Sequence, residues 1–153
     1  MAINVAESSR TRDLSGLAAQ LRLVITRTAR RLRQEAGTDL GPSQTAALAT
    51  VERHGPLTPT ELARIERIQR PSATRIVARL EEAGLVERVP DPADARSFTV
   101  NATGDGRALM KKLRTRKNAY LARRLRHLSG DELATLDRAA AILEGLLEGE
   151  RRR

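Results

Sequence analysis

The sequence predicts a mainly α-helical protein with one small β-hairpin, and three observations lead to this fold class. Apolar residues recur at spacings of three and four over most of the chain, which is the period of an amphipathic helix. Near residues 85–101, two short alternating segments flank a stretch of turn-forming residues, as in a hairpin. Aromatic residues are nearly absent, so Leu, Ala, Ile and Val must form the core, which suits helix-on-helix packing better than a sandwich or barrel.

Length and composition exclude several classes of protein. The 153 residues suffice for one core, or for one small domain with extensions. The chain has no cysteine, which excludes disulfides, thiol switches and thiolate metal sites. The first residues lack the apolar run of a signal peptide, and no window approaches the roughly 18 apolar residues of a membrane span. The sequence is therefore expected to be cytoplasmic, without membrane contact.

The N-terminal third predicts two helices after a tail. Residues 1–12 carry no periodic pattern and are expected to form a flexible tail. Residues 13–36 show helical spacing from Leu14 onward and end at Gly37. A second helix is expected from Pro42 to Arg53, before the Gly55-Pro56 stop.

The next two helices form a helix-turn-helix. Thr58, Pro59 and Glu61 have the spacing of a capped helix start with a capping box. The buried side of this helix is expected to consist of Leu62, Ala63 and Ile65. A helix from about Pro71 to Gly84 follows, whose core-facing side is expected to comprise Ala73, Ile76, Val77 and Leu80. Its other side carries Arg70, Ser72, Arg75, Arg79 and Glu82, with Thr74 near the margin.

A hairpin and two long helices complete the chain. Leu85–Val89 and Ser97–Asn101 read as strands around a turn-rich loop, so the hairpin has a protruding tip, or wing. Thr103 is expected to cap a helix that ends near Leu128. The last helix is expected over residues 131–148, with leucines and one alanine at the a/d spacing of a coiled-coil seam: Leu133, Leu136, Ala140, Leu143 and Leu147. Residues 149–153 are expected to be a basic tail.

The formal net charge of +9 is unevenly distributed. Residues 1–54 carry +3, residues 55–100 carry seven basic and seven acidic side chains, and residues 101–153 carry +6. The helix-turn-helix and hairpin are therefore neutral, and their arginines can act on nucleic acid only if they gather on one face. The basic run over residues 107–126 is read as a solvated face in its distal half. Its proximal half, around Arg107 to Arg114, is equally compatible with a solvated face and with a phosphate-facing rim or an attraction for an anionic effector.

This arrangement points to DNA, because a helix fits the major groove and a wing can reach the neighbouring minor groove. Arg75 is the strongest candidate for reading a base, with a phosphate contact or solvation as the alternative. Ser72 and Thr74 are candidates for bases or phosphate, or for local capping, and Arg70 and Arg79 for phosphate. At the wing, Arg96 is the candidate for a narrow A·T-rich minor groove, compatible with an ion pair to Asp94.

Other chemistry lacks the required residues. His54 and His127 are the only histidines and form no ligand cluster, so no metal is expected. Adjacent carboxylates such as Glu81 and Glu82 point apart on a helix and make poor acid/base partners. No phosphate-binding glycine loop or nucleophile elbow is present. The protein is expected not to be an enzyme and to need no cofactor.

Two motifs carry a family resemblance: LTPTELA with IQRPSATRIVARLEEAGLVER, and DPADARSFTVNATGDGRAL. Together they resemble the MarR family of winged helix-turn-helix transcriptional regulators, best over residues 40–109. The resemblance implies a DNA-binding domain over residues 37–103 and a helical dimerisation region from residues 13–36 and 104–148. It also implies that Arg96 enters the minor groove, steadied by Asp94.

The function expected from the resemblance is that of a homodimeric, sequence-specific regulator, a repressor of promoters with pseudo-palindromic operators. Members of the family often release DNA when a phenolic or aromatic acid binds between the dimerisation helices and the winged helix. Two alternatives stay open from the residues themselves: an architectural protein that coats DNA without reading its sequence, and a helical interaction module that has lost DNA binding.

Overall fold

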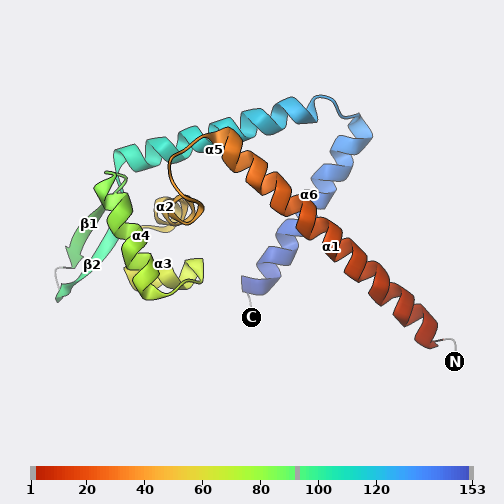
Figure 1. Cartoon of the computed structure of the whole chain (residues 1–153), viewed down its shortest axis with the longest axis horizontal. Coiled ribbons are helices and arrows are strands. Elements are labelled where there is room, and N and C mark those ends of the chain that lie inside the picture. The colour runs from red at the N-terminus through yellow and green to blue at the C-terminus, as the bar shows by residue number, and fades with distance from the viewer. Residues whose placement is uncertain (1–2, 92–93, 152–153) are drawn as a thin grey trace. The chain divides into compact units, whose positions relative to one another are not determined.

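The computed structural model describes residues 3–91 and 94–151, and the side chains of residues 13–90 and 97–147. It confirms a mainly helical protein with one antiparallel hairpin (Figure 1). The chain divides into two compact units, residues 1–117 and 118–153. The elements in chain order are α1 (Ile3–Ala36), α2 (Pro42–His54), α3 (Pro59–Glu66), α4 (Arg70–Glu82), β1 (Val86–Asp91), β2 (Asp94–Ala102), α5 (Gly104–Leu125) and α6 (Gly130–Arg151).

Helices extend into both predicted tails. α1 begins at Ile3, so a helix stands where a flexible tail over residues 1–12 was expected. No glycine or proline occurs between Ile3 and Asp13, and each added residue of an existing helix gains a backbone hydrogen bond. α6 likewise runs to Arg151, into the predicted basic tail of residues 149–153. Arg152 and Arg153 lie outside the described residues.

The core of the first unit lies where α2, α3, α4, the hairpin and the start of α5 meet (Figure 1). Each element contributes aliphatic side chains that are almost inaccessible to solvent, and burying one such side chain stabilises the fold by about 1.5–3 kcal/mol. The largest of them are Leu48, Val51, Leu62, Val77, Leu80, Val100 and Leu113. No aromatic side chain is among them, as the composition predicts.

Two residues predicted to be core-facing are less buried. Ile65 is 36% exposed, because α3 has only eight residues and buries Leu62 and Ala63 instead. Ile76 of α4 is half-buried, since it lies at the edge of a groove between α4 and the start of α2. The core-facing assignment of Ile65 was therefore wrong, and that of Ile76 holds only in part.

The capping box predicted for α3 is present. The Glu61 backbone N–H donates to Thr58 Oγ1 over 3.2 Å, and the Thr58 N–H donates to Glu61 Oε2 over 2.8 Å. The hydrogen bond from the Thr58 backbone is the main reason that the pKa of the Glu61 carboxyl lies below its usual value. At the other end, Arg67 adopts a left-handed backbone conformation with φ of 53°, which ends α3 and turns the chain into α4.

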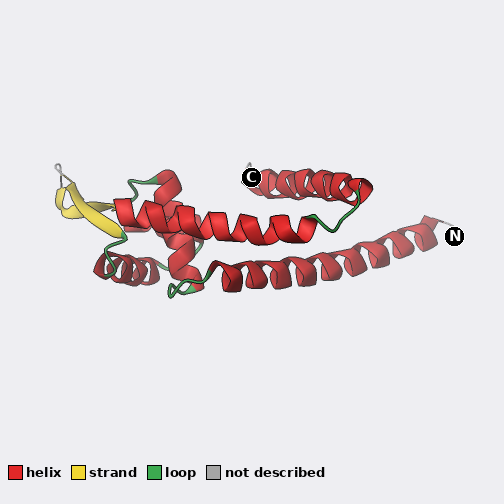
Figure 2. Ribbon diagram, turned by 90° about the horizontal axis from the view of Figure 1, so that it is seen from above, coloured by secondary structure: helices red, strands yellow, loops and turns green. Residues whose placement is uncertain are grey.

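The hairpin is joined to the helical core along its base. Val86 pairs with Ala102 and Arg88 with Val100, and Leu57 forms a bridge to Val100 with hydrogen bonds of 3.1 and 2.7 Å. The strands extend further than predicted and project as the ribbon drawn in yellow in Figure 2. Residues 92–93 at the tip lie outside the described residues.

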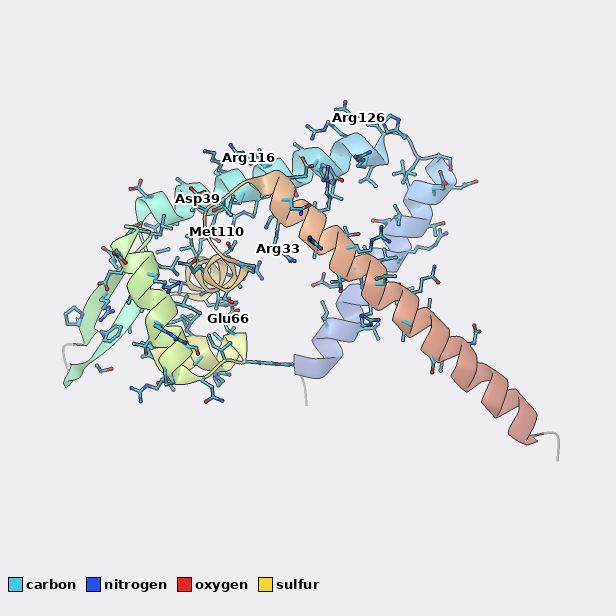
Figure 3. All side chains as sticks on the ribbon, viewed as in Figure 1. Arg33, Asp39, Glu66, Met110, Arg116 and Arg126 are labelled. Carbon is cyan, nitrogen blue, oxygen red and sulfur yellow. The ribbon has the colours of Figure 1, made fainter. Side chains whose placement is uncertain are left out.

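The start of α5 is fixed to the core and to the end of α1. Thr103 Oγ1 accepts from the Gly106 N–H over 3.1 Å, so Thr103 caps the helix as predicted. Arg114 forms a two-pronged ion pair with Glu52 of α2, with both distances 2.9 Å. Arg116 Nη1 donates to the Ala36 carbonyl over 2.8 Å and thereby caps the end of α1 (Figure 3).

The second unit comprises the last turns of α5, from Asn118 onward, and the whole of α6. Ser129 caps α6, because its Oγ accepts from the Glu132 N–H while the Glu132 carboxylate accepts from the Ser129 N–H over 2.8 Å. Within this unit, most of the predicted seam stays solvent-exposed: Leu133 is 40%, Leu136 48% and Leu147 59% exposed.

Candidate nucleic-acid interface

α4 buries a stripe of Ala73, Val77 and Leu80 against the core. Its remaining residues lie on either side of this stripe. Ser72, Arg75 and Arg79 lie on one side, at spacings of three and four residues, and line a common groove. Arg70 and Thr74 are exposed but do not line that groove. The structure thus brings together three of the five residues predicted on this helix.

The groove has a volume of about 520 Å³ and is open to solvent on one side. α4 forms one wall with Ser72, Arg75, Ile76 and Arg79, the start of α2 forms the other, and Ile68 closes one end. Arg75 Nη2 lies 3.5 Å from Ser72 Oγ, so the guanidinium and the hydroxyl are neighbours on the groove wall.

The α2 wall was not predicted. It consists of Gly41, Pro42, Ser43 and Gln44. Gly41 has no side chain to cap α2; instead its N–H donates to Gln44 Oε1 over 3.0 Å. The start of α2 is far from α4 in the sequence, and no sequence pattern indicates that the two lie side by side. Their contact is seen only in the tertiary structure.

Two nearby acidic side chains, Glu66 and Glu81, are engaged elsewhere, which helps a neutral segment to present positive charge. The Thr50 hydroxyl donates a hydrogen bond to Glu66 at the end of α3 (Figure 3). Glu81 forms a 2.8 Å ion pair with Arg88 of the hairpin. Neither carboxylate lines the groove, so Arg75 and Arg79 give it a positive potential.

Thr74 and Arg70 are related by a local contact. The Thr74 hydroxyl donates to the Arg70 carbonyl one turn earlier, over 3.1 Å. This is the local use that serine and threonine hydroxyls often have in helices. The hydroxyl must give up this bond before it can donate to DNA.

The wing candidates Asp94 and Arg96 belong to β2 by their backbone, but their side chains lie outside the described part of the structure. The backbone places them beyond Phe98, next to the tip of the hairpin. Their predicted ion pair and minor-groove contact therefore stay predictions.

The basic run of α5 is partly used within the protein. Arg107 donates to the Ala102 carbonyl, while Arg114 and Arg116 hold α2 and α1 in place. Lys111 and Lys112 have no hydrogen-bond or ion-pair partner among the described residues. In the proximal half, Arg107 and Arg114 are thus used for protein contacts, a use that the sequence did not predict, while Lys111 and Lys112 are not.

Comparison with known proteins agrees with this arrangement. Residues 38–97 match the profile described as MarR family. The Multiple antibiotic resistance protein MarR of Salmonella typhimurium is 33% identical over 100 residues, which are 65% of this chain and 69% of that protein. The chain belongs to the MarR family. An uncharacterised HTH-type transcriptional regulator of Mycobacterium leprae is 36% identical over 86% of this chain and 93% of that protein.

A solved structure shows the same fold. The crystal structure of a putative transcriptional regulator protein from Pseudomonas aeruginosa superimposes with a TM-score of 0.79 and 33% identity, covering 89% of this chain and 96% of that one. This MarR-family protein is thus a DNA-binding transcriptional regulator with a winged helix-turn-helix. Within the described residues, no helix is both long and apolar enough to span a membrane.

Proposed function

We propose that this regulator binds a pseudo-palindromic operator as a homodimer and represses the promoter that contains it. The observation that carries the proposal is the positive groove shared by α2 and α4. Ser72, Arg75 and Arg79 line it together, although they belong to a segment with no net charge. Base reading is assigned to Arg75, phosphate or base contacts to Ser72 and Thr74, and phosphate contacts to Arg70 and Arg79.

The wing completes the proposed site. Arg96 enters the minor groove next to the half-site read by α4, and Asp94 holds its guanidinium. Narrow A·T-rich minor grooves concentrate negative potential, which favours an inserted arginine. The hairpin supports this role by carrying both residues close to its tip.

Homodimerisation is supported by apolar rows that the described chain leaves uncovered. Along α1, the side chains of Leu14, Leu17, Leu21, Val24 and Ile25 are between 36% and 62% exposed, and α6 exposes the seam described above. Single exposed leucines are ordinary, but rows at helical spacing on two helices indicate a protein interface. A second copy supplies matching rows, and it sets two α4 helices at the spacing of successive major grooves, about 10–10.5 base pairs.

An experiment on DNA tests the central proposal. Duplexes selected from a random pool by the wild-type protein should share a pseudo-palindrome, and this sequence should survive a large excess of random duplex at physiological salt. Arg75→Ala should weaken binding about 10- to 100-fold, corresponding to about 1–3 kcal/mol. Lys112→Ala, which removes a charge on α5, serves as the control and should change affinity far less.

The alternative of an architectural protein makes the opposite forecast. A protein that coats DNA would lose the selected fragment to random duplex and would yield no consensus. Absence of any mobility shift would instead indicate a helical module without DNA binding. Either result overturns the proposal.

The oligomeric state is tested by sedimentation at micromolar concentration. Leu136→Asp lies in the seam of α6 and should yield monomers, whereas Ala141→Asp places the same charge outside the seam and should leave a dimer. A monomeric wild-type protein would remove the basis for a two-fold operator.

We further propose that a small aromatic acid relieves binding from a cavity of about 220 Å³ at the junction of α1, α2 and α5. Pockets for drug-sized ligands occupy about 300–1,000 Å³, so a smaller molecule suits this one. Arg33 and Lys117 supply positive charge, while Ala36, Leu40 and Leu113 supply apolar surface. A ligand there shifts the population towards dimers whose α4 spacing no longer matches DNA.

Titration with salicylate, a simple phenolic acid, tests the cavity. Salicylate should bind the wild-type protein and displace the selected duplex, and Lys117→Gln should weaken both effects. Lys112→Gln, on the same helix but outside the cavity, should behave as the wild type. Displacement that is unaffected by Lys117→Gln would place the ligand elsewhere.

A further inference from the structure

The base of the wing contains a cluster of three side chains from three different elements: Glu81 of α4, Arg88 of β1 and Phe98 of β2. Arg88 Nε donates to Glu81 Oε2 over 2.8 Å. The guanidinium carbon of the same arginine lies 4.7 Å from the centre of the Phe98 ring, within the range of a cation–π contact. One arginine thus touches both α4 and the second wing strand.

This cluster lies at the point along the hairpin where the side chains change from buried to exposed. Val86, Arg88 and Pro90 lie opposite Ala102, Val100 and Phe98, and alternate residues of a strand share one face. On that face, Val86, Val100 and Ala102 are buried, whereas Arg88 is exposed and Phe98 only half-buried. The fully buried part of the core therefore ends at the Arg88–Val100 pair, Phe98 packs against it only half-buried, and the register shifts just beyond, between Pro90 and Asp91.

Because only the half-buried Phe98 continues the packing there, hydrophobic contacts alone fix the angle at which the outer hairpin leaves the body only weakly. Near that point, the Thr99 hydroxyl donates a 3.5 Å hydrogen bond to the Val89 carbonyl, which joins only the two strands. The ion pair that reaches from the hairpin to α4 belongs to Arg88, and so does the ring contact with Phe98. We propose that Arg88 is a positioning residue that aligns the wing with α4. It joins the helix proposed to read the major groove to the strand that carries the proposed minor-groove arginine, so this inference rests on the proposed function.

Two features distinguish this role from direct DNA contact and from general stability. The Glu81 carboxylate neutralises the Arg88 charge, so Arg88 is a poor phosphate ligand. The Arg88 and Glu81 side chains are 36% and 40% exposed, and ion pairs of this kind contribute little to folding. Breaking the cluster should therefore change the alignment of two DNA contacts while the melting temperature stays nearly constant.

The test uses duplexes selected by the wild-type protein, in versions with A·T-rich and G·C-rich sequence at the wing contact and with an intact or altered core half-site. The wild-type protein should prefer the A·T-rich flank about 10-fold, a typical effect of one base pair. Glu81→Gln and Arg88→Gln should reduce this flank preference to about two-fold or less. Both variants should keep the discrimination between intact and altered core half-sites, since neither substitution changes the α4 residues that line the groove, Ser72, Arg75 and Arg79.

Matched variants complete the design. Glu87→Gln removes a negative charge, as Glu81→Gln does, but from the residue next to Arg88, whose side chain points to the opposite face of the hairpin. This variant should retain the flank preference. Arg88→Lys keeps the charge for Glu81 but loses the planar stacking group, so it should recover part of the preference. In the Glu81→Gln/Arg88→Gln double variant, the two losses should not add, because both remove one interaction.

The outcomes separate the two proposals. If the wild-type protein selects no sequence, the proposed function fails. If it selects one and Glu81→Gln or Arg88→Gln retains the full flank preference, the positioning role of Arg88 is refuted. Equal loss of flank and core discrimination would also refute it, because that pattern indicates general damage to the domain.

Discussion

Replacement of Gly106 by alanine should destabilise this protein, although alanine favours helices more than glycine does. Gly106 is buried in the first turn of α5. A Cβ atom there would lie 2.1 Å from the Leu85 carbonyl oxygen and 3.3 Å from Leu48 Cδ1. Both distances are shorter than ordinary van der Waals contacts, so helix and hairpin base must move apart.

The magnitude follows from two opposing effects. The Leu85 carbonyl is backbone and accepts a hydrogen bond from the Thr103 N–H over 3.1 Å, so it cannot rotate away as a flexible side chain could. Overpacking of this kind costs about 1–3 kcal/mol or more, while the gain in helix propensity is at most about 1 kcal/mol. A net loss of about 2 kcal/mol corresponds to a melting temperature about 4–8 °C lower for a chain of this size.

The assay is thermal unfolding followed by circular dichroism, at one protein concentration because a dimer melts in a concentration-dependent way. Gly145→Ala in α6 is the matched control: a Cβ atom at that position would have no described atom of another residue within 4 Å beyond its own helix turn and chain neighbours, so this variant should melt at the same temperature or slightly higher. A Gly106→Ala protein as stable as the wild type would refute the close approach of α5 to Leu85.

Three further predictions concern single contacts. The pKa of Glu52 is lowered chiefly by its hydrogen bond from Arg114, so this pair stabilises the fold above the ordinary glutamate pKa, and the stabilisation is lost as the pH falls through the lowered value. The difference in melting temperature between the wild type and Glu52→Gln should therefore shrink on acidification. A difference that stays constant with pH would contradict this. Thr103→Ala removes the cap of α5 and a 2.7 Å hydrogen bond to the Gly84 carbonyl, which should lower the free energy of unfolding in urea by about 1–2 kcal/mol. Thr115→Ala, which removes a hydroxyl that bonds only within its own helix, should leave this free energy nearly unchanged. Gly84 has φ of 71°, so Gly84→Ala should lose about 1 kcal/mol and Gly84→Asn clearly less in the same assay; equal losses would show that the left-handed conformation is not the cause.

Local signals in the sequence were sufficient for most of the secondary structure. The Thr58–Glu61 capping box, the Thr103 cap and the helix-ending Gly84 act within a few residues, and each is found where it was predicted. The spacing of apolar residues likewise identified the buried stripe of α4. Predictions failed where no local stop exists, as at the start of α1, and where burial depends on neighbouring elements, as at Ile65.

What the residues alone determined is therefore the type and order of the elements and the winged helix-turn-helix family, because capping, turns and periodicity act over short stretches of chain. Only the tertiary structure decided which side chains meet. It placed the start of α2 opposite Arg75, assigned Arg114 and Arg116 to protein contacts, and brought Glu81, Arg88 and Phe98 together. These contacts join elements distant in sequence, and their geometry depends on how the whole core packs rather than on any one segment.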